Sequence, residues 1–376
     1  MGLSQLANTE RPINNCLQER RMTVLNTSIS LEEFALSVAT AGNKVCFIGE
    51  GEMGIGKSAM LYKIAEMLPT HLPAYIDCTL LDLGDFALPY TVEENGMKVT
   101  RFAPNARFRF HEGKPVIIML DEIGKAMKSV KNVLLTLMNE GRIGDHYLPE
   151  GSIVFGTTNL MGEGVGDLLE RHARNRVCMV RIRKPSADEW IENYAIPKGL
   201  LPEIIAWVKQ FPHCMASFDD PSQRDNPYIN QPTKAGQGAC VTPRSLEKAC
   251  YIAQHRSTLG NNVTIAALAG VIGESAARDM QAFFTVADKL PTWDAIIHSP
   301  DTAKLPDDAV AKCICVYGAL TRVEKDTLSK WMTYVQRMDK EWQALFAKSV
   351  MKSPKQSFCV MNKDFKDWAL ANEWLF

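Results

Sequence analysis

Short apolar runs alternate with amphipathic segments through the first half of the chain. Apolar residues recur at helical spacing in residues 58–68 and 130–140. The runs between these segments are almost continuously apolar, as expected of parallel strands covered on both faces. They span residues 44–49, 74–77, 116–121, 152–158 and 177–182. The alternation predicts an α/β fold with a doubly wound, mostly parallel sheet.

Two insertions interrupt this alternation. Asn95-Gly96 is the strongest two-residue hairpin signal in the chain, and β-branched residues flank it on both sides. The second insertion covers residues 142–156. Here we predict a hairpin that turns at Pro149-Glu150-Gly151 and whose outgoing arm becomes the next core strand.

The second half of the chain follows a helical pattern after Lys184-Pro185. Residues 212–241 interrupt it with a polar stretch rich in Pro, Gly and Asn, which predicts a long surface loop. Further on, apolar residues recur at steps of three and four, which predicts one long helix with an apolar stripe. They are Leu328, Trp331, Met332, Val335, Met338, Trp342, Leu345 and Phe346.

These patterns predict four parts of the chain. An N-terminal arm (1–22) precedes an α/β domain (23–185). A helical domain (186–290) and a helical C-terminal extension (291–376) follow.

Composition narrows the class of protein only slightly. The 376 residues are 46% hydrophobic and 23% charged, and the formal net charge is −1, so no global field draws the chain to nucleic acid or membrane. No apolar stretch approaches the roughly 20 residues of a membrane helix, and the first residues lack a signal-peptide core. The ten cysteines form no C-x-x-C pair, which argues against zinc. We therefore expect a cytoplasmic protein with reduced cysteines.

Residues 51–58 fit the phosphate-loop pattern G-x-x-x-x-G-K-[ST] between a predicted strand and a predicted helix. Glycines let the backbone wrap around phosphates and present N–H groups to them. Lys57 should reach the β- and γ-phosphates of ATP, and the Ser58 hydroxyl should bind Mg²⁺. The predicted nucleotide contacts are Gly51, Gly54, Ile55, Gly56, Lys57, Ser58 and Ala59.

Two carboxylates, Asp121 and Glu122, follow the apolar residues 116–120. A buried parallel strand exposes its carboxyl end at the edge of the sheet where the phosphate loop also lies. We expect Asp121 to hold Mg²⁺ through water and Glu122 to orient and polarise the attacking water. A strand that simply runs into a charged turn is the alternative.

Polar residues downstream offer further contacts to the nucleotide. Asn159 ends the next predicted strand, where its amide could contact the γ-phosphate or the lytic water, although Asn is also a common turn residue. Thr242 and Pro243 suit the first turn of a helix that would aim Arg244 at the phosphates. The alternative for Arg244 is a surface position.

Three arginines, Arg171, Arg174 and Arg176, precede the fifth predicted strand. An arginine that faces a neighbouring subunit's nucleotide would stabilise charge on the transferred phosphoryl group. The sequence does not say which of the three this is, and a solvated helix face explains at least one of them.

In the order of these motifs the chain resembles the MoxR-like AAA+ ATPases, in particular the bacterial and phage members found beside von Willebrand A-domain proteins. The resemblance covers residues 44–255 and, more weakly, 265–320. The phosphate loop and the Asp-Glu pair are shared by all AAA+ proteins, whereas RIGDHYLPEG and the NRV and KPSADEW segments point to this branch. The matching segments are residues 51–58, 81–90, 116–126, 134–159, 173–190 and 242–249.

The resemblance implies a ring, hexameric in the family, with ATP bound between subunits. It assigns Asn159 to sensor 1, Arg244 to sensor 2 and Arg176 to the arginine finger. The two hairpins are similar to inserts that face the pore or the substrate in this clade. Residues 186–290 would be the AAA+ lid, and no resemblance covers residues 322–376.

We therefore expect an ATPase that remodels or activates a protein partner, for which a von Willebrand A-domain protein is a candidate. The alternative is a nucleic-acid motor or loader, because residues 322–367 carry ten Lys or Arg against six Asp or Glu, with aromatic residues between them. A nucleotide-gated switch with little turnover is a third hypothesis, and Glu122 argues against it.

Overall fold

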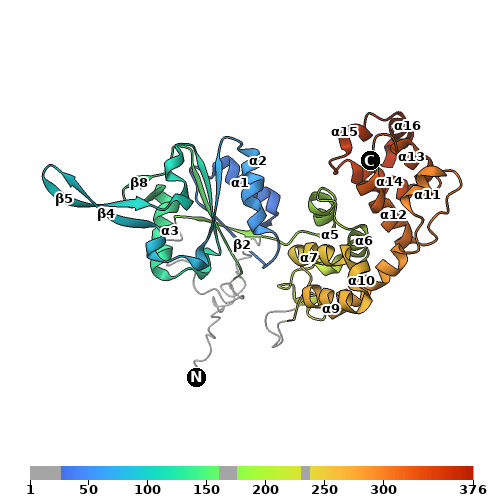
Figure 1. Ribbon diagram of the computed structural model, residues 1–376, viewed down its shortest axis with the longest axis horizontal. Helices are drawn as coiled ribbons and strands as arrows, with labels where there is room; N and C mark the ends of the chain where they lie inside the picture. The colour runs from blue at the N-terminus through green and yellow to red at the C-terminus, as the bar shows by residue number, and fades with distance from the viewer. Residues whose placement is uncertain (1–26, 161–175, 230–237, 376) are drawn as a thin grey trace, which may run out of the picture.

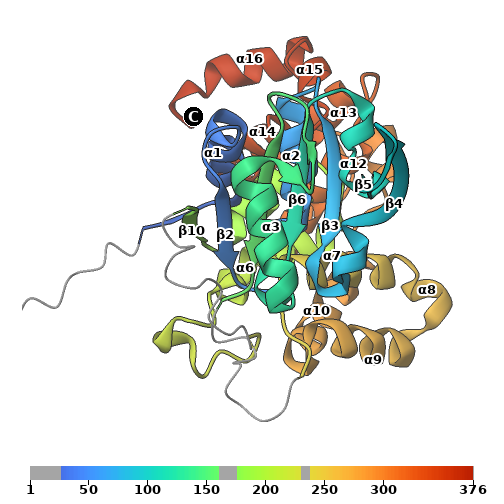
Figure 2. The same ribbon diagram turned by 90° about the vertical axis from the view of Figure 1, so that its left-hand side faces the viewer.

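The computed structural model describes residues 27–160, 176–229 and 238–375. A six-stranded sheet forms the centre of the first half, with every neighbouring pair parallel, which confirms the predicted α/β fold. Figure 2 views this half from the side of the hairpin. In sheet order, the strands are β1 (Ser28–Ile29), β10 (Cys178–Ile182), β2 (Phe47–Gly51), β9 (Ile153–Thr158), β6 (Val116–Asp121) and β3 (Leu72–Asp77).

Helices cover both faces of this sheet (Figure 1). On one face, α1 (Leu31–Ala41) and α2 (Met60–Met67) bury residues such as Phe34 and Ile64 against β2, β6 and β9. On the other face, α3 (Lys128–Glu140) buries Leu134 and its neighbours against β3 and β6. Because both faces are covered, the central strands carry the continuous apolar runs seen in the sequence.

The predicted hairpin at Asn95-Gly96 is confirmed. Strands β4 (Ala87–Glu94) and β5 (Met97–Pro104) pair in antiparallel register, and both turn residues have positive φ, 52° and 77°. Such a turn matches the twist of the arms that it joins. The hairpin projects well beyond the body of the molecule (Figure 1).

The predicted turn of the second hairpin is wrong. Strand β7 (Arg142–Ile143) pairs with β8 (His146–Tyr147), so the chain reverses at Gly144-Asp145 and not at Pro149-Glu150-Gly151. The outgoing strand β9 joins the parallel sheet between β2 and β6. Gly144 has a φ of 56°, a conformation that glycine adopts readily and that lets the chain reverse here. The Pro149-Glu150-Gly151 segment then leads the chain into β9.

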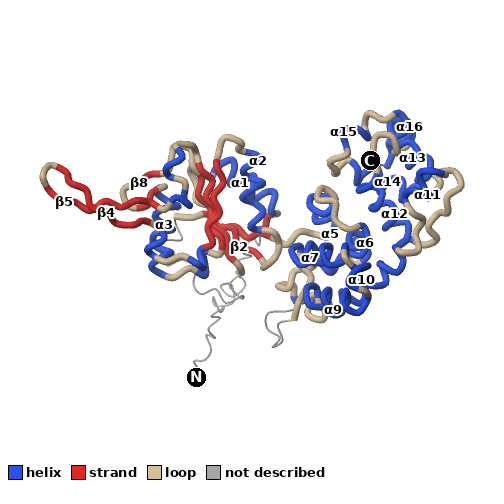
Figure 3. Tube along the Cα trace, in the orientation of Figure 1, coloured by secondary structure: helices blue, strands red, loops and turns tan. Residues whose placement is uncertain are grey.

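The second half of the described chain is helical (Figure 3). One hydrophobic core runs through it from Ala187 to Trp368, and it contains Trp207, Phe284 and Trp331. The helices are α5 (Ala187–Trp190), α6 (Pro202–Gln210), α7 (Pro243–Gln254), α8 (Arg256–Leu259), α9 (Asn261–Ile272), α10 (Glu274–Ala287), α11 (Trp293–His298), α12 (Ala309–Arg322), α13 (Leu328–Val335), α14 (Lys340–Val350), α15 (Gln356–Cys359) and α16 (Lys363–Ala371).

The prediction of one long helix in this half is wrong. The long helix predicted from the apolar stripe is two helices, because the chain leaves helical geometry between Val335 and Lys340. The Gln343 amide bonds the carbonyls of Gln336 and Met338 at 3.1 and 2.8 Å, which satisfies backbone groups exposed by the break. The apolar residues still recur at helical spacing, because α13 and α14 both pack against the same core.

The predicted surface loop 212–241 is partly buried where the structure describes it. Cys214 and Tyr228 lie in the helical core, and the Tyr228 ring contacts Trp207 edge-on. The Tyr228 hydroxyl donates to Asp279 at 2.6 Å. The polar, Pro-rich composition of this segment therefore did not reveal that Cys214 and Tyr228 pack into the helical core.

Membrane and disulfide features can be assessed only in the described ranges. Every helix there is too short or too polar to cross a membrane. The cysteines described there are free thiols. The predicted N-terminal arm lies outside the described residues.

Candidate active site

The carboxyl ends of the central strands meet at one edge of the sheet, where a cavity of about 290 Å³ opens. The structure brings together here the phosphate loop, both predicted carboxylates, Asn159 and Arg244. The lining residues are Met53, Gly54, Lys57, Ser58, Asp121, Glu122, Lys125, Asn159 and Arg244. The remaining predicted contacts, Gly51, Ile55, Gly56 and Ala59, do not line this cavity.

Lys57 is buried in the phosphate loop. Its ammonium donates to the carbonyl oxygens of Gly51 and Glu52 at 2.7 and 2.8 Å and to Asn159 Oδ1 at 2.7 Å. These acceptors hold a positive charge beside the cavity. The same contact ties Asn159, at the end of β9, to the loop after β2. Asn159 is therefore part of the site and more than a turn residue.

The loop needs glycine at Gly54. Its φ is +71°, and an added Cβ would lie only 2.8 Å from the Thr242 hydroxyl. The Ile55 side chain, in contrast, is buried in the core beneath the loop, so only its backbone is available to a ligand. The tight turn thus exposes backbone at the cavity and lets the helical half approach closely.

Asp121 is buried and accepts hydrogen bonds from three side chains. Ser58 Oγ and Tyr75 OH donate to its Oδ2 atom at 2.9 and 2.8 Å, and Thr157 Oγ1 donates to Oδ1. A carboxylate next to a serine hydroxyl is an oxygen donor set of the kind that Mg²⁺ prefers when it also keeps phosphate and water ligands. The residues present therefore fit the predicted metal.

Glu122 has a left-handed backbone, with φ of 55°. This conformation is uncommon for a residue with a side chain and is often found at functional sites. The Glu122 carboxylate lies 3.1 Å from Lys125 Nζ. Sequence reasoning missed Lys125, because a single lysine in a short turn carries no motif.

Arg244 reaches the cavity from the first turn of α7. Thr242 caps this helix by accepting from the Ser245 N–H at 3.0 Å, and Pro243 occupies the first helical position, as predicted. The Arg244 N–H donates to the Gly54 carbonyl at 3.1 Å. The helical half therefore contacts the phosphate loop directly.

Arg176 lies elsewhere. It is exposed and just precedes β10, whose first residue, Cys178, bonds to the Cys46 carbonyl before β2. Because the strands are parallel, this is the edge of the sheet opposite to the cavity. Arg171 and Arg174 lie outside the described residues.

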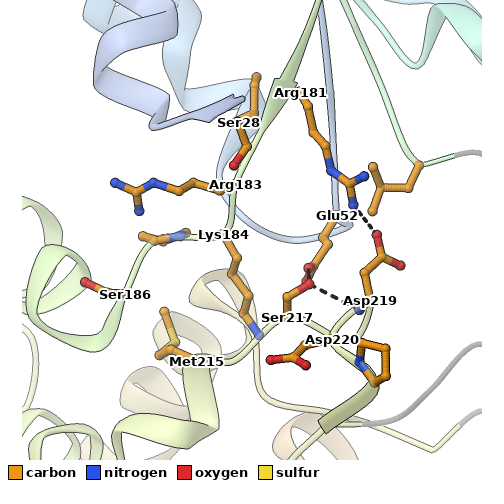
Figure 4. A pocket seen from close by; sticks show the side chains of 14 residues that line it. Ser28, Glu52, Arg181, Arg183, Lys184, Ser186, Met215, Ser217, Asp219 and Asp220 are labelled. Atoms are coloured by element: carbon orange, nitrogen blue, oxygen red, sulfur yellow. Dashed lines mark hydrogen bonds and ion pairs between the residues drawn. The ribbon is translucent and has the colours of Figure 1, made fainter. Parts of the chain in front are cut away.

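A second cavity of about 610 Å³ lies where the α/β half meets the helical half (Figure 4). Glu52 of the phosphate loop accepts a hydrogen bond from Ser217, and Arg181 at the end of β10 pairs with Asp219. Lys184 Nζ donates to the carbonyls of Ala216 and Val241 at 3.1 and 3.2 Å. These contacts fasten the segment before α7 to the phosphate loop and to β10.

Burial shifts Glu52 and Lys184 at this junction toward their neutral forms. Desolvation raises the pKa of Glu52, and the Ser217 hydrogen bond and the charge of Lys184 only partly oppose it. Desolvation likewise lowers the pKa of Lys184. The sequence does not reveal these contacts, because the partners of Glu52 and Lys184 lie far away along the chain.

The match to a protein-family model agrees with this geometry. Residues 45–180 match the family model described as ATPase family associated with various cellular activities (AAA). This segment contains the phosphate loop, Asp121, Glu122 and Asn159. The chain therefore carries an AAA ATPase domain, and the protein is an ATPase.

Similar solved structures include a putative ATPase from Cytophaga hutchinsonii, at 15% identity and a TM-score of 0.28, covering 69% of this chain and 88% of that one. Two mutants of RuvB from Thermotoga maritima are also similar. The first is 16% identical and covers 82% of this chain and 86% of its own. The second is 15% identical and covers 83% of this chain and 91% of its own. Both have TM-scores of 0.34. No curated protein matches the sequence.

Proposed function

We propose that this ATPase assembles into a ring, hexameric as in the MoxR-like proteins, and that ATP hydrolysis between subunits remodels or activates a protein partner. The observation that carries the proposal is the projecting β4–β5 hairpin, with apolar side chains far from the cavity. A von Willebrand A-domain protein is the candidate partner by resemblance.

The roles that we propose in hydrolysis follow from the contacts in the cavity. Lys57 binds the β- and γ-phosphates, and Asn159 contacts the γ-phosphate or the lytic water, a role that its hydrogen bond to Lys57 supports. Ser58 and Asp121 would hold Mg²⁺, which supplies charge neutralisation on the phosphates when bound. Glu122 orients the attacking water, and Arg244 contacts the phosphates from the helical half.

We propose that Arg176 completes the site of a neighbouring subunit. A strand rises about 3.3 Å per residue, so β10 alone separates Arg176 from its own cavity by roughly 16 Å or more. An arginine side chain does not span that distance within one subunit. The exposure of Arg176 leaves it available to a second copy.

One face of the hairpin is mostly apolar and also carries the ion pair between Arg101 and Glu94. Residues opposite each other in an antiparallel pair share a face, which places Leu88, Tyr90 and Val92 on the same side as Val99 and Met97. Leu88 and Met97 are 65% and 66% exposed. An isolated ribbon gains little stability from such side chains, so their exposure supports contact with a partner.

The test replaces residues 92–101 with a short Gly-Ser linker. Basal ATPase activity should stay within a few-fold of the wild-type rate, because the hairpin is remote from the cavity, and stimulation by the partner or remodelling of it should be lost. The double variant Leu88→Ser, Met97→Ser should show the same loss. Thr91→Ser and Thr100→Ser, which alter the other face, serve as the matched control. If the linker variant loses both its basal ATPase activity and its assembly into a ring, the hairpin is needed for the structure and does not serve the partner.

The nucleic-acid alternative loses its main support in the structure. Stacking on bases requires exposed aromatic rings. Trp331, Tyr334 and Phe346 are fully buried in the helical core, where Trp331 contacts the other two rings. An ATPase rate that rises with single-stranded DNA, but not with a protein partner, would reverse this preference.

A further inference from the structure

We infer that Tyr75 is a positioning residue for the carboxylate of Asp121, and that it sets the affinity of the site for Mg²⁺. The inference rests on the proposed role of Asp121 in holding the metal. Tyr75 lies on β3 and belongs to none of the motifs recognised in the sequence.

The hydrogen bonds of Asp121 single out Tyr75. The Asp121 Oδ2 atom accepts hydrogen bonds from two hydroxyls, that of Ser58 at 2.9 Å and that of Tyr75 at 2.8 Å. Ser58 is itself a proposed metal ligand, whereas Tyr75 is not. At the other oxygen, Thr157 and the Glu122 N–H donate to Oδ1. Tyr75 is thus the donor that can fix the orientation of Oδ2 independently of the metal ligands.

The strand register explains why a tyrosine serves here. Strand β3 pairs with β6 so that Asp77, and not Tyr75, stands opposite Asp121. Tyr75 lies two residues back and faces Met119. Only a long side chain crosses this diagonal, and a rigid phenol does so with few rotatable bonds.

Removal of the Tyr75 hydroxyl should disturb little else in the fold. Tyr75 is 46% exposed, so Tyr75→Phe should leave the packing of β3 intact.

The experiment compares Tyr75→Phe with the unmodified chain, both in a Glu122→Gln background that slows hydrolysis. Binding of a fluorescent ATP analogue is titrated against Mg²⁺ and, separately, measured in EDTA. The half-saturating Mg²⁺ concentration should rise about 3- to 10-fold, because a hydrogen bond to a charged metal ligand is lost. Affinity in EDTA should not change. Tyr62→Phe, at an exposed position on α2, is the matched control.

Asp121→Asn separates the inference from the proposed metal site. If Asp121→Asn leaves the Mg²⁺ dependence unchanged, the proposed metal site is wrong. If Asp121→Asn shifts it and Tyr75→Phe does not, the inference about Tyr75 fails alone. Weaker binding of Tyr75→Phe in EDTA would also overturn it, because Tyr75 would then shape the phosphate loop.

Discussion

The Glu122 carboxylate lies in the cavity next to Asp121 and is paired with Lys125. Glu122→Gln preserves the shape of the side chain but removes the charge that polarises water. We expect this variant to bind ATP and Mg²⁺ and to hydrolyse ATP about 100-fold more slowly or worse. It should also accumulate an ATP-bound assembly, visible as a larger species by light scattering. Unchanged turnover would mean that another group activates the water.

Glu52 makes a pH-dependent contribution to stability that can be measured. Its folded-state pKa is raised above the ordinary value of 4.5, because burial disfavours the carboxylate. A raised pKa means that its contribution is fully present below about pH 4.5 and is lost as the pH rises through the folded-state pKa. Glu52→Gln removes this loss and can still accept the Ser217 hydrogen bond.

The melting temperature of Glu52→Gln, relative to that of the unmodified protein, should therefore be higher at pH 8 than at pH 5. Thermal unfolding at both pH values measures the difference. Glu50→Gln, one residue before Gly51 on β2, is the control. A difference that does not change with pH would show that Glu52 titrates normally in the folded protein.

At the scale of single elements, α7 joins the helical half to the phosphate loop. Thr242 both caps this helix and packs against Gly54. Thr242→Ala should lower the free energy of unfolding by about 1 kcal/mol, the usual cost of losing a threonine cap. Urea denaturation measures this change.

Thr333→Ala is the control for the cap. Thr333 is exposed in the interior of α13, where alanine has the higher helix propensity, so stability should be equal or slightly greater. Equal effects of the two substitutions would show that the Thr242 hydroxyl does not act as a cap. A loss of ATPase activity in Thr242→Ala larger than its loss of stability would indicate that this contact also places Arg244.

At the scale of the whole molecule, the position of Arg176 allows a test of whether it acts in the active site of a neighbouring subunit. Arg176→Ala should reduce hydrolysis on the order of 10³-fold while nucleotide binding largely survives, by analogy with other arginine fingers. Mixing Arg176→Ala subunits with Lys57→Ala subunits, each inactive alone, should recover part of the activity. Some interfaces in the mixture then pair an intact phosphate loop with an intact arginine.

Arg171→Ala and Arg174→Ala are the controls and should be milder. A mixture that stays inactive, although its subunits demonstrably assemble together, would mean that Arg176 does not act between subunits or that every site must be intact. Titrating Arg176→Ala subunits into wild-type protein separates these cases. Linear loss of activity indicates independent sites, and steep loss indicates a coordinated ring.

The sequence by itself determined those features that neighbouring residues encode. Continuous apolar runs predicted the parallel sheet, because strands covered on both faces have no polar side. Asn95-Gly96 predicted its hairpin, because few residue pairs adopt positive φ twice in succession. The glycine spacing before Lys57 and the carboxylates after residues 116–120 predicted the cavity, since parallel strands end at one edge.

The tertiary structure alone decided the contacts between distant residues. Tyr75 meets Asp121, and Glu52 meets Ser217, 165 residues away, through the packing of separate elements. Neither pair leaves a periodic pattern or a motif in the chain. Periodicity also could not reveal the break between α13 and α14, because both helices present apolar residues to one core. Local patterns specify elements, whereas the partners of a side chain depend on where those elements pack.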